Sequence, residues 1–223
     1  MNDTVLVIAA HPDDEVLGCG GAIARHVQGG DSVYVAFLSD GVAARQGAEI
    51  VEDARKRAEY ANEASRILGV KQTFQLPFPD NKMDSVPLLD IIQELQPIFE
   101  DVDPNIIYTH FYKDLNVDHR ITYQATMTIA RALPNSKVSK ILCFEVFSST
   151  EWANEHERFS PTAYVSIEDT FQTKLEALKA YDEEMRDFPH PRSYRAIKAL
   201  AEYRGAMSGL HKAEAFEVAR LIL

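Results

Sequence analysis

Cysteine is scarce in this sequence. Only Cys19 and Cys143 are present among 223 residues, far apart in the chain and each in an apolar context. A disulfide framework needs several cysteines and an oxidising compartment, and a zinc knuckle needs a C-x-x-C spacing. The sequence therefore argues against both, and it predicts two reduced cysteines that serve in packing.

Basic residues are also few. The chain has 23 lysines and arginines against 34 aspartates and glutamates, which gives a formal net charge of -11. Proteins that bind nucleic acid rely on clustered lysine and arginine. We therefore expect no nucleic-acid partner, although a small anionic substrate stays compatible with this charge if local cations meet it.

Long apolar runs are absent. The first run, residues 4–10, lacks a basic flank and leads directly into charged residues, so it is too short for a signal peptide or a membrane span. The chain also shows no internal repeat and no low-complexity tract. These features predict a cytoplasmic protein without a membrane span, in which residues 1–223 form one domain.

The sequence does contain an alternation of strand and helix patterns. Short apolar runs rich in β-branched and aromatic residues predict buried strands at residues 4–10, 32–39, 105–111 and 140–148. Apolar residues at helical spacing predict helices at residues 20–30, 50–68, 88–99, 118–133, 170–185, 192–205 and 211–223. This order predicts an α/β protein with a mostly parallel sheet and helices on both faces, a Rossmann-like three-layer α/β/α fold.

Charged residues follow two of the predicted strands. The string HPDDE, residues 11–15, comes directly after the first strand, and DLNVDH, residues 114–119, follows the strand at 105–111. The carboxyl ends of parallel strands meet at one edge of the sheet, so the two strings converge if their strands are neighbours. Charged groups at the edge of a core need a partner, and a cation would supply one.

His11, Asp14 and His119 are the candidate metal ligands. A catalytic zinc ion takes three imidazole or carboxylate ligands and keeps one position open for water. His11 and Asp14 lie three residues apart in a turn and can bind one ion from the same side, and His119 would complete the set. Asp13 points away from Asp14 and can accept a proton from zinc-bound water, whose pKa is roughly 7. This arrangement predicts hydrolysis.

These motifs make the chain resemble the LmbE-like or PIG-L family of zinc-dependent deacetylases. AHPDDE and DLNVDH carry the resemblance, and LSDG, RILGV, FPDNKMD and AEAF extend it over most of the chain. The resemblance implies that an acetyl group is removed from an N-acetylglucosamine-type sugar, free or linked to a nucleotide, lipid or glycan. It also implies a homo-oligomer, and zinc, or alternatively iron(II), as the ion.

The resemblance also implies roles for individual residues. It gives the same three zinc ligands and makes Asp13 the general base. It further implies that an arginine of the helix at 50–68 reaches the substrate pocket. We assign this role to Arg57, with Arg55 as the alternative.

The second motif departs from the family's pattern at Asn116. Many members have His-Pro-Asp-His there, and the first His polarises the acetyl oxygen or protonates the leaving amine. Asn116 can donate a hydrogen bond to an oxyanion but cannot deliver a proton at neutral pH, and it can equally be a plain turn residue.

The missing acid is assigned to His190, in the string DFPHPRSYR at residues 187–195. Arg192 in the same string is the candidate to bind an anionic part of the substrate, such as a phosphate. Proline fixes its own φ and restricts the preceding residue, so the string presents both side chains at low entropic cost. The alternative interpretation is a rigid connector between two helices.

Other interpretations stay open at this point. Asp114 either orients a zinc-bound histidine or caps a loop, and His119 is alternatively a first-turn helix residue beside an Asp118 N-cap. The string GCGGA, residues 18–22, lacks dinucleotide-loop spacing, so its glycines are expected to let a helix pack closely on the sheet.

Two other classes of function are compatible with the same ligands. One is an amidase or another metallohydrolase that acts on a sugar conjugate, and the other is a non-catalytic metal-dependent sugar-binding protein. A binding protein would not need Asp13, so the presence of Asp13 favours catalysis.

Overall fold

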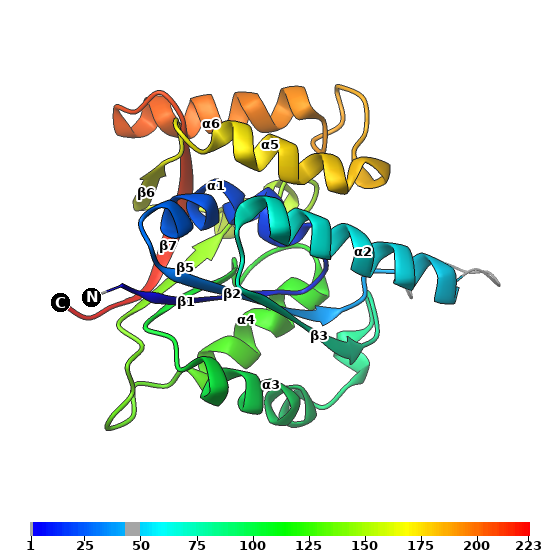
Figure 1. The fold of residues 1–223 in the computed structure, drawn as a ribbon, viewed down its shortest axis with the longest axis vertical. Coiled ribbons are helices and arrows are strands. Elements are labelled where there is room, and N and C mark those ends of the chain that lie inside the picture. The colour runs from blue at the N-terminus through cyan, green and yellow to red at the C-terminus, as the bar shows by residue number, and fades with distance from the viewer. Residues whose placement is uncertain (1, 43–49) are drawn as a thin grey trace.

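The computed structural model describes residues 2–42 and 50–223, and these contain one β-sheet flanked by helices (Figure 1). The strands are β1 (Thr4–Ala9), β2 (Ser32–Ser39), β3 (Gln72–Phe78), β4 (Ile106–His110), β5 (Lys140–Phe144), β6 (Ala163–Ser166) and β7 (Ala213–Leu221). The α-helices are α1 (Asp14–Gln28), α2 (Ile50–Leu68), α3 (Leu88–Val102), α4 (Val117–Ile129), α5 (Phe171–Ala180) and α6 (Tyr194–Ser208). Short 3₁₀ turns are η1 (Met83–Ser85), η2 (Thr150–Trp152), η3 (Glu155–Glu157) and η4 (Asp182–Glu184).

The strand order is β3-β2-β1-β4-β5-β7-β6. The first five strands in this order are parallel, whereas β7 runs antiparallel to both β5 and β6. Strand β1 lies in the middle of these five, with Val5 opposite Val33 of β2 and Ile106 of β4. The chain order reverses on the two sides of β1, and a ligand crevice forms at the carboxyl ends of strands at such a point.

Alternation along β1 divides the core into two layers. Val5, Val7 and Ala9 point into one apolar cluster, and Leu6 and Ile8 point into the other. Successive side chains of a strand face opposite sides, so a continuous apolar run buries both faces of the sheet. Helices α3 and α4 cover one face, and α1 and α2 cover the other (Figure 1). The prediction of a Rossmann-like α/β/α fold is therefore confirmed.

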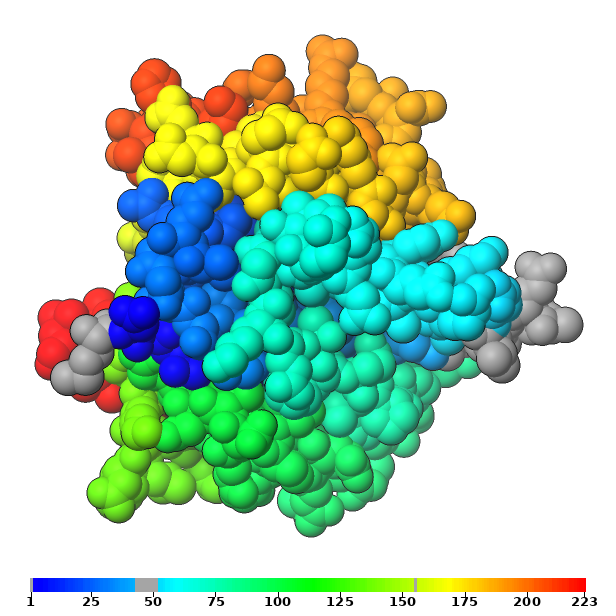
Figure 2. All heavy atoms as spheres, in the orientation of Figure 1, coloured from blue at the N-terminus to red at the C-terminus, as the bar shows by residue number. Residues whose placement is uncertain are grey.

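The C-terminal segments add to the layer of α1 and α2. Helix α5 packs against both of these helices, and α6 packs against β6 and β7. In the space-filling view, the yellow residues of α5 lie directly on the blue and cyan residues of α1 and α2, and the orange residues of α6 lie above the yellow ones (Figure 2).

One predicted element is wrong. Residues 211–223 were expected to be helical, but residues 213–221 form strand β7. In AEAFEVARL the polar residues Glu214, Glu217 and Arg220 recur every third position, which resembles a helical pattern. Phe216, which is fully buried, nevertheless pairs with Phe144 of β5. Pairing with β5 satisfies the backbone hydrogen bonds of this segment, and a window of local sequence does not reveal such a long-range partner.

Strands β3 and β6 were not predicted from the sequence, and several helix ends differ from the prediction. Both strands lie at the edges of the sheet, where polar and half-exposed residues such as Gln72 and Thr73 weaken the apolar signal. Helix α1 begins at Asp14 rather than residue 20, and α4 ends at Ile129 rather than residue 133. Among the described helices, none combines the length and apolar character needed to cross a bilayer.

Candidate active site and metal centre

The two charged strings meet at the carboxyl edge of β1 and β4. Asp13 is the residue before helix α1 and has φ 113° and ψ -29°, a left-handed conformation that L residues rarely adopt. Strained backbone of this kind clusters at functional sites. Asp14 is the first residue of α1, and its Oδ2 atom accepts a hydrogen bond from the backbone N–H of His11 at 3.0 Å.

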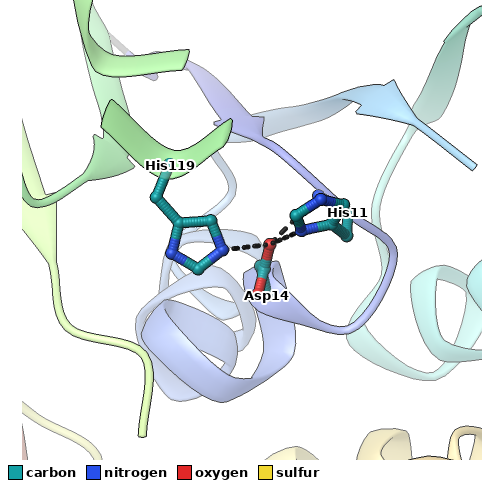
Figure 3. Close-up of side chains that lie close together, drawn as sticks. All are labelled: His11, Asp14 and His119. Carbon is teal, nitrogen blue, oxygen red and sulfur yellow. Dashed lines mark hydrogen bonds and ion pairs between the residues drawn. The ribbon is translucent and has the colours of Figure 1, made fainter. Parts of the chain in front are cut away.

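His11, Asp14 and His119 form a buried cluster (Figure 3). Oδ2 of Asp14 lies 3.1 Å from Nδ1 of His11 and 3.3 Å from Nε2 of His119. Oδ1 of Asp14 is buried and has no hydrogen-bond partner among the described residues. A buried carboxylate oxygen without a partner, beside two imidazoles, fits a site that holds a metal ion.

The pKa values in this cluster favour ionised side chains. Burial opposes ionisation of Asp14, but His119 and His11 outweigh it and hold the pKa of Asp14 well below its usual range. Burial also disfavours the charged form of His119, yet Asp14 and Asp114 raise its pKa to about 9. The cluster thus joins carboxylates with imidazoles that hold protons, and a bound metal ion would replace those protons.

Carboxylates outside the cluster also contact the two histidines. Oδ2 of Asp118 lies 3.0 Å from Nε2 of His11, and Oδ1 of Asp114 lies 3.2 Å from Nδ1 of His119. Such contacts fix the ring orientation and the tautomer of a metal ligand. Asp114 also accepts a hydrogen bond from the backbone N–H of Asn116 at 2.9 Å, so both interpretations of this residue describe real contacts.

Asp118 is not the N-cap of helix α4. That place belongs to Asn116, whose Oδ1 accepts a hydrogen bond from the N–H of Asp118 at 2.8 Å. The carboxylate of Asp118 instead accepts backbone N–H groups of Asn81 at 2.6 Å and Met83 at 3.0 Å. These contacts join α4 to the turn after β3, and the sequence analysis gave Asp118 no part in the site.

A pocket of about 220 Å³ opens beside the cluster. Its lining comprises His11, Pro12, Asp13, Gly41, Arg57, Asp80, Asn81, Asn116, Glu184 and Arg192. Sequence reasoning missed Asp80 and Glu184. Asp80 lies in the string FPDNKMD that carried part of the family resemblance, and its Oδ1 is 3.2 Å from Nε2 of His11. Glu184 lies in an acidic run after α5 that carries no local signal.

Both arginines predicted to bind substrate contact the carboxylate of Asp13. Nη1 of Arg192 donates to Oδ2 of Asp13 at 2.9 Å, and Nη1 of Arg57 lies 3.5 Å from the same oxygen. Arg57 also pairs with Glu184 at 2.7 Å. Burial raises the pKa of Asp13, while Arg192 and Arg57 oppose this shift. Arg55 instead forms exposed ion pairs along α2, so Arg57 is the arginine that lines the pocket.

His190 lies on the surface rather than among the described residues that line the pocket. Its Nδ1 accepts a hydrogen bond from the backbone N–H of Arg192 at 3.0 Å, and its carbonyl accepts one from Ser193. These contacts agree with the alternative interpretation, in which this string is a rigid connector, here between η4 and α6. The role of His190 as general acid stays a prediction.

The two cysteines are buried, and two further histidines contact neighbouring side chains. Cys19 and Cys143 are free and buried, and burial raises the pKa of Cys143 to about 12. His26 makes structural contacts, 2.6 Å to Asp31 and 2.9 Å to the hydroxyl of Tyr108. His110 is buried and accepts the N–H of Ala10, and its ring stacks on His119 with centroids 3.9 Å apart.

A buried His-Asp-His cluster with an adjacent carboxylate, at the carboxyl edge of a mostly parallel sheet, has the composition of a catalytic metal site in a hydrolase. The family model for GlcNAc-PI de-N-acetylase, PIG-L, matches residues 6–130. The chain belongs to this family, which confirms the resemblance drawn from its motifs.

Comparisons with individual proteins agree with this family. The Escherichia coli (strain K12) protein named "Uncharacterized deacetylase YaiS" is 34% identical over 183 residues, covering 79% of this chain and 89% of that protein. The diacetylchitobiose deacetylase of Thermococcus kodakarensis is 27% identical over 220 residues, covering 94% and 80%. The solved structure of N,N'-diacetylchitobiose deacetylase from Pyrococcus horikoshii has a TM-score of 0.79 at 22% identity, covering 97% of this chain and 83% of that one, and it supports the fold.

Proposed function

We propose that this protein is a metal-dependent N-deacetylase that hydrolyses the N-acetyl group of an amino sugar or an amino-sugar conjugate. One observation carries the proposal: the carboxylate of Asp13 lines the pocket directly beside the cluster of His11, Asp14 and His119. A metal-dependent binding protein needs the three ligands, but it has no use for a strained second carboxylate at the mouth of the cluster.

We propose zinc as the resident ion, with iron(II) as the alternative. Imidazole and carboxylate donors suit both ions, and the unpartnered Oδ1 of Asp14 supports an ion at this place. When bound, the ion would act as a Lewis acid toward water and the acetyl carbonyl. His11, Asp14 and His119 would hold it, while Asp118 and Asp114 fix the two imidazole rings.

Asp13 is proposed to accept the proton of the attacking water. A general base works best when its pKa approaches the operating pH, and burial moves the pKa of Asp13 in that direction. Arg192 and Arg57 hold the carboxylate in place at 2.9 Å and 3.5 Å. Asp13 can then return this proton to the leaving nitrogen, which would supply the acid that the Asn116 substitution removes from the second motif.

Asn116 is proposed to donate a hydrogen bond from Nδ2 to the acetyl oxygen. In this structure Nδ2 donates instead to Oδ1 of Asn81 at 3.2 Å, a long bond that a better acceptor would replace. His190 is kept as a second candidate acid. It would have to leave its hydrogen bond to the N–H of Arg192 to reach the pocket, so a variant His190→Ala that retains full activity would remove it from the mechanism.

The proposed substrate is a small acetamido sugar, free or linked to a nucleotide, lipid or glycan. A pocket of about 220 Å³ lies below the range of roughly 300–1,000 Å³ typical of drug-sized ligands, which supports a single sugar unit at the cluster. Arg57 and Arg192 supply hydrogen-bond donors for hydroxyl groups or an anionic substituent. The Thermococcus relative, named as a diacetylchitobiose deacetylase, supports this class.

Three general properties complete the proposal. Residues 1–223 are proposed to form one domain, which is supported by the sheet of the described residues, because it holds both β1 and β7. A reducing compartment such as the cytoplasm is supported by two buried free thiols. A homo-oligomer is proposed from the family resemblance alone.

The proposal is tested by acetate release from free, nucleotide-linked and lipid-linked N-acetyl sugars, with protein reconstituted with zinc or iron(II). We expect acetate and free amine in equal amounts from at least one substrate. Asp13→Asn should lower kcat by about 10²- to 10⁴-fold, the usual contribution of a general base. Asparagine tolerates the left-handed backbone of this position, so the fold should persist.

Asp187→Asn provides the matched control, because it makes the same change on an exposed aspartate of the connector. It should keep the activity of the unsubstituted protein. Acetate release that survives Asp13→Asn would exclude Asp13 as the base. No release from any substrate, with one metal ion bound per chain, would favour the amidase or the binding protein.

A further inference from the structure

Helix α1 is interrupted at Cys19, whose backbone has φ -145° and ψ 21°. The interruption separates a short first segment, residues 14–18, from a longer second segment, residues 20–28. In a continuous helix the N–H of Gly21 would donate to the carbonyl of Leu17 four residues earlier. Both groups are buried here and must find other partners.

A buried ion pair takes the place of this hydrogen bond. Nζ of Lys174 donates to the carbonyl of Leu17 at 2.8 Å and to Oε1 of Glu214 at 2.6 Å. Oε1 of Glu214 accepts the N–H of Gly21 at 2.9 Å, and Oε2 accepts the N–H of Ala22 at 2.7 Å. The pair therefore bridges the two segments, and each of its side chains is only 5% exposed.

The first segment cannot keep its direction unaided. Helices shorter than about 12 residues are marginal without packing partners, and this one spans little more than a turn. Lys174 of helix α5 and Tyr181, the residue after α5, bind the two ends of this segment. The hydroxyl of Tyr181 donates to Glu15 at 2.9 Å near the start, and Lys174 binds the carbonyl of Leu17 near the end.

Stability alone does not account for the ion pair. Burying two charges costs about as much as their attraction returns, and an apolar pair of similar size is often equally or more stable. A charged pair at a helix break does supply a fixed geometry, because each of its four hydrogen bonds has a defined direction.

We propose that Lys174 and Glu214 are positioning residues for the candidate metal centre. The ion pair fixes the direction of residues 14–18, and with it the carboxylate of Asp14, relative to the imidazole of His119 on α4. The inference rests on the proposed function, because it requires that these side chains bind a metal ion.

The test measures metal binding rather than catalysis, with Co²⁺ as a spectroscopic probe. The dissociation constant of Co²⁺ is determined by competition with a chelator, and the visible absorption of bound Co²⁺ reports its coordination geometry. Glu214→Gln keeps the size of the side chain but removes its charge. We expect Co²⁺ to bind about tenfold more weakly or worse, as for residues that support metal ligands, with a changed spectrum.

The control variant is Ile91→Ala on helix α3, across the sheet from α1. Ile91 is fully buried in the other core layer, so its truncation lowers the stability of the protein without touching α1. It should keep the Co²⁺ dissociation constant and the spectrum of the unsubstituted protein. A metal affinity that falls in proportion to stability in both variants would contradict a positioning role.

A second variant covers the case in which Glu214→Gln does not fold. Replacing both Lys174 and Glu214 with Met removes the ion pair and leaves no unpaired buried charge. This variant should fold and still bind Co²⁺ more weakly. If it retains the dissociation constant within about twofold and an unchanged spectrum, the ion pair has no positioning role. Failure of the unsubstituted protein to bind Co²⁺ would contradict the proposed function, and this inference with it.

Discussion

At the scale of a single residue, Asp13 combines a carboxylate beside the His-Asp-His cluster with a left-handed backbone conformation. Its neighbourhood in the sequence, directly after an apolar strand and beside Asp14, predicts a carboxylate close to a metal ion. Nothing in that string predicts φ 113°, a conformation that costs a non-glycine residue about 1–3 kcal/mol. The left-handed backbone lets two successive carboxylates serve different purposes: Asp14 points into the cluster and Asp13 lines the pocket.

Arg57 and Arg55 provide a matched pair at the residue scale. Arg57→Met removes a buried guanidinium that contacts Asp13 and Glu184, so we expect kcat/KM to fall by roughly 10- to 100-fold, the range for a lost hydrogen bond to a charged group. Arg55→Met removes an exposed cation, and its kinetics should match those of the unsubstituted protein. Steady-state kinetics on the identified acetyl substrate checks both. Equal losses in the two variants would mean that Arg57 has no specific place in the pocket.

The pair of Asp31 and His26 gives a prediction for pH. Burial opposes ionisation of Asp31, but the hydrogen bonds from His26 and from the backbone N–H of Asp3, together with the charge of Lys140, outweigh it and lower the pKa of Asp31 below its usual value. A lowered carboxyl pKa stabilises the fold above the ordinary value near 3.9, and this contribution disappears as the pH falls through the folded-state value. Asp31→Asn should therefore lower the free energy of unfolding by about 1 kcal/mol at pH 7.

The difference between Asp31→Asn and the unsubstituted protein should shrink as the pH falls from 5 toward 3. Urea unfolding at several pH values measures it. A difference that stays constant over this range would show that the charge of Asp31 contributes nothing.

At the scale of elements, prediction from sequence succeeded where burial on both faces dominates. The strands at residues 4–9, 32–39, 106–110 and 140–144 are continuous apolar runs, and the structure confirms each. The helix predicted at residues 211–223 was wrong, because the pairing of β7 with β5 and β6 is a long-range property that local periodicity does not contain. The helix break at Cys19 was missed for the same reason, since its partners lie more than 150 residues further along the chain.

Gly18 tests how closely helix α1 packs on the sheet. A Cβ atom at this position would lie 2.3 Å from the ring of Phe144 in β5, which is far inside contact distance. Gly18→Ala should therefore lower the free energy of unfolding by about 1–3 kcal/mol, the usual cost of overpacking. Chemical denaturation measures the loss, and adding Phe144→Leu should restore part of it. A Gly18→Ala variant as stable as the unsubstituted protein would mean that the helix is free to move away from the sheet.

The whole molecule joins residues that lie far apart in the chain. His11 and Asp14 follow β1, His119 lies on α4, and the pocket takes Glu184 and Arg192 from the C-terminal segment. The motif residues of the first two segments could be predicted because their strands end at one edge of the sheet. Glu184 could not, because its place depends on how α5 packs on α1 and α2, and neighbouring residues do not encode that packing.

Metal binding should therefore stabilise the protein as a whole. An ion held by residues of both α1 and α4 binds the folded chain and not the unfolded one, so at a free concentration 100 times its dissociation constant it adds about 2.7 kcal/mol to the free energy of unfolding. Thermal unfolding with zinc and with a chelator should show a higher Tm for the zinc form. Asp14→Asn should remove most of this shift, whereas Asp187→Asn, an exposed substitution, should keep it. A zinc-dependent rise in Tm that persists in Asp14→Asn would place the ion outside the cluster of His11, Asp14 and His119.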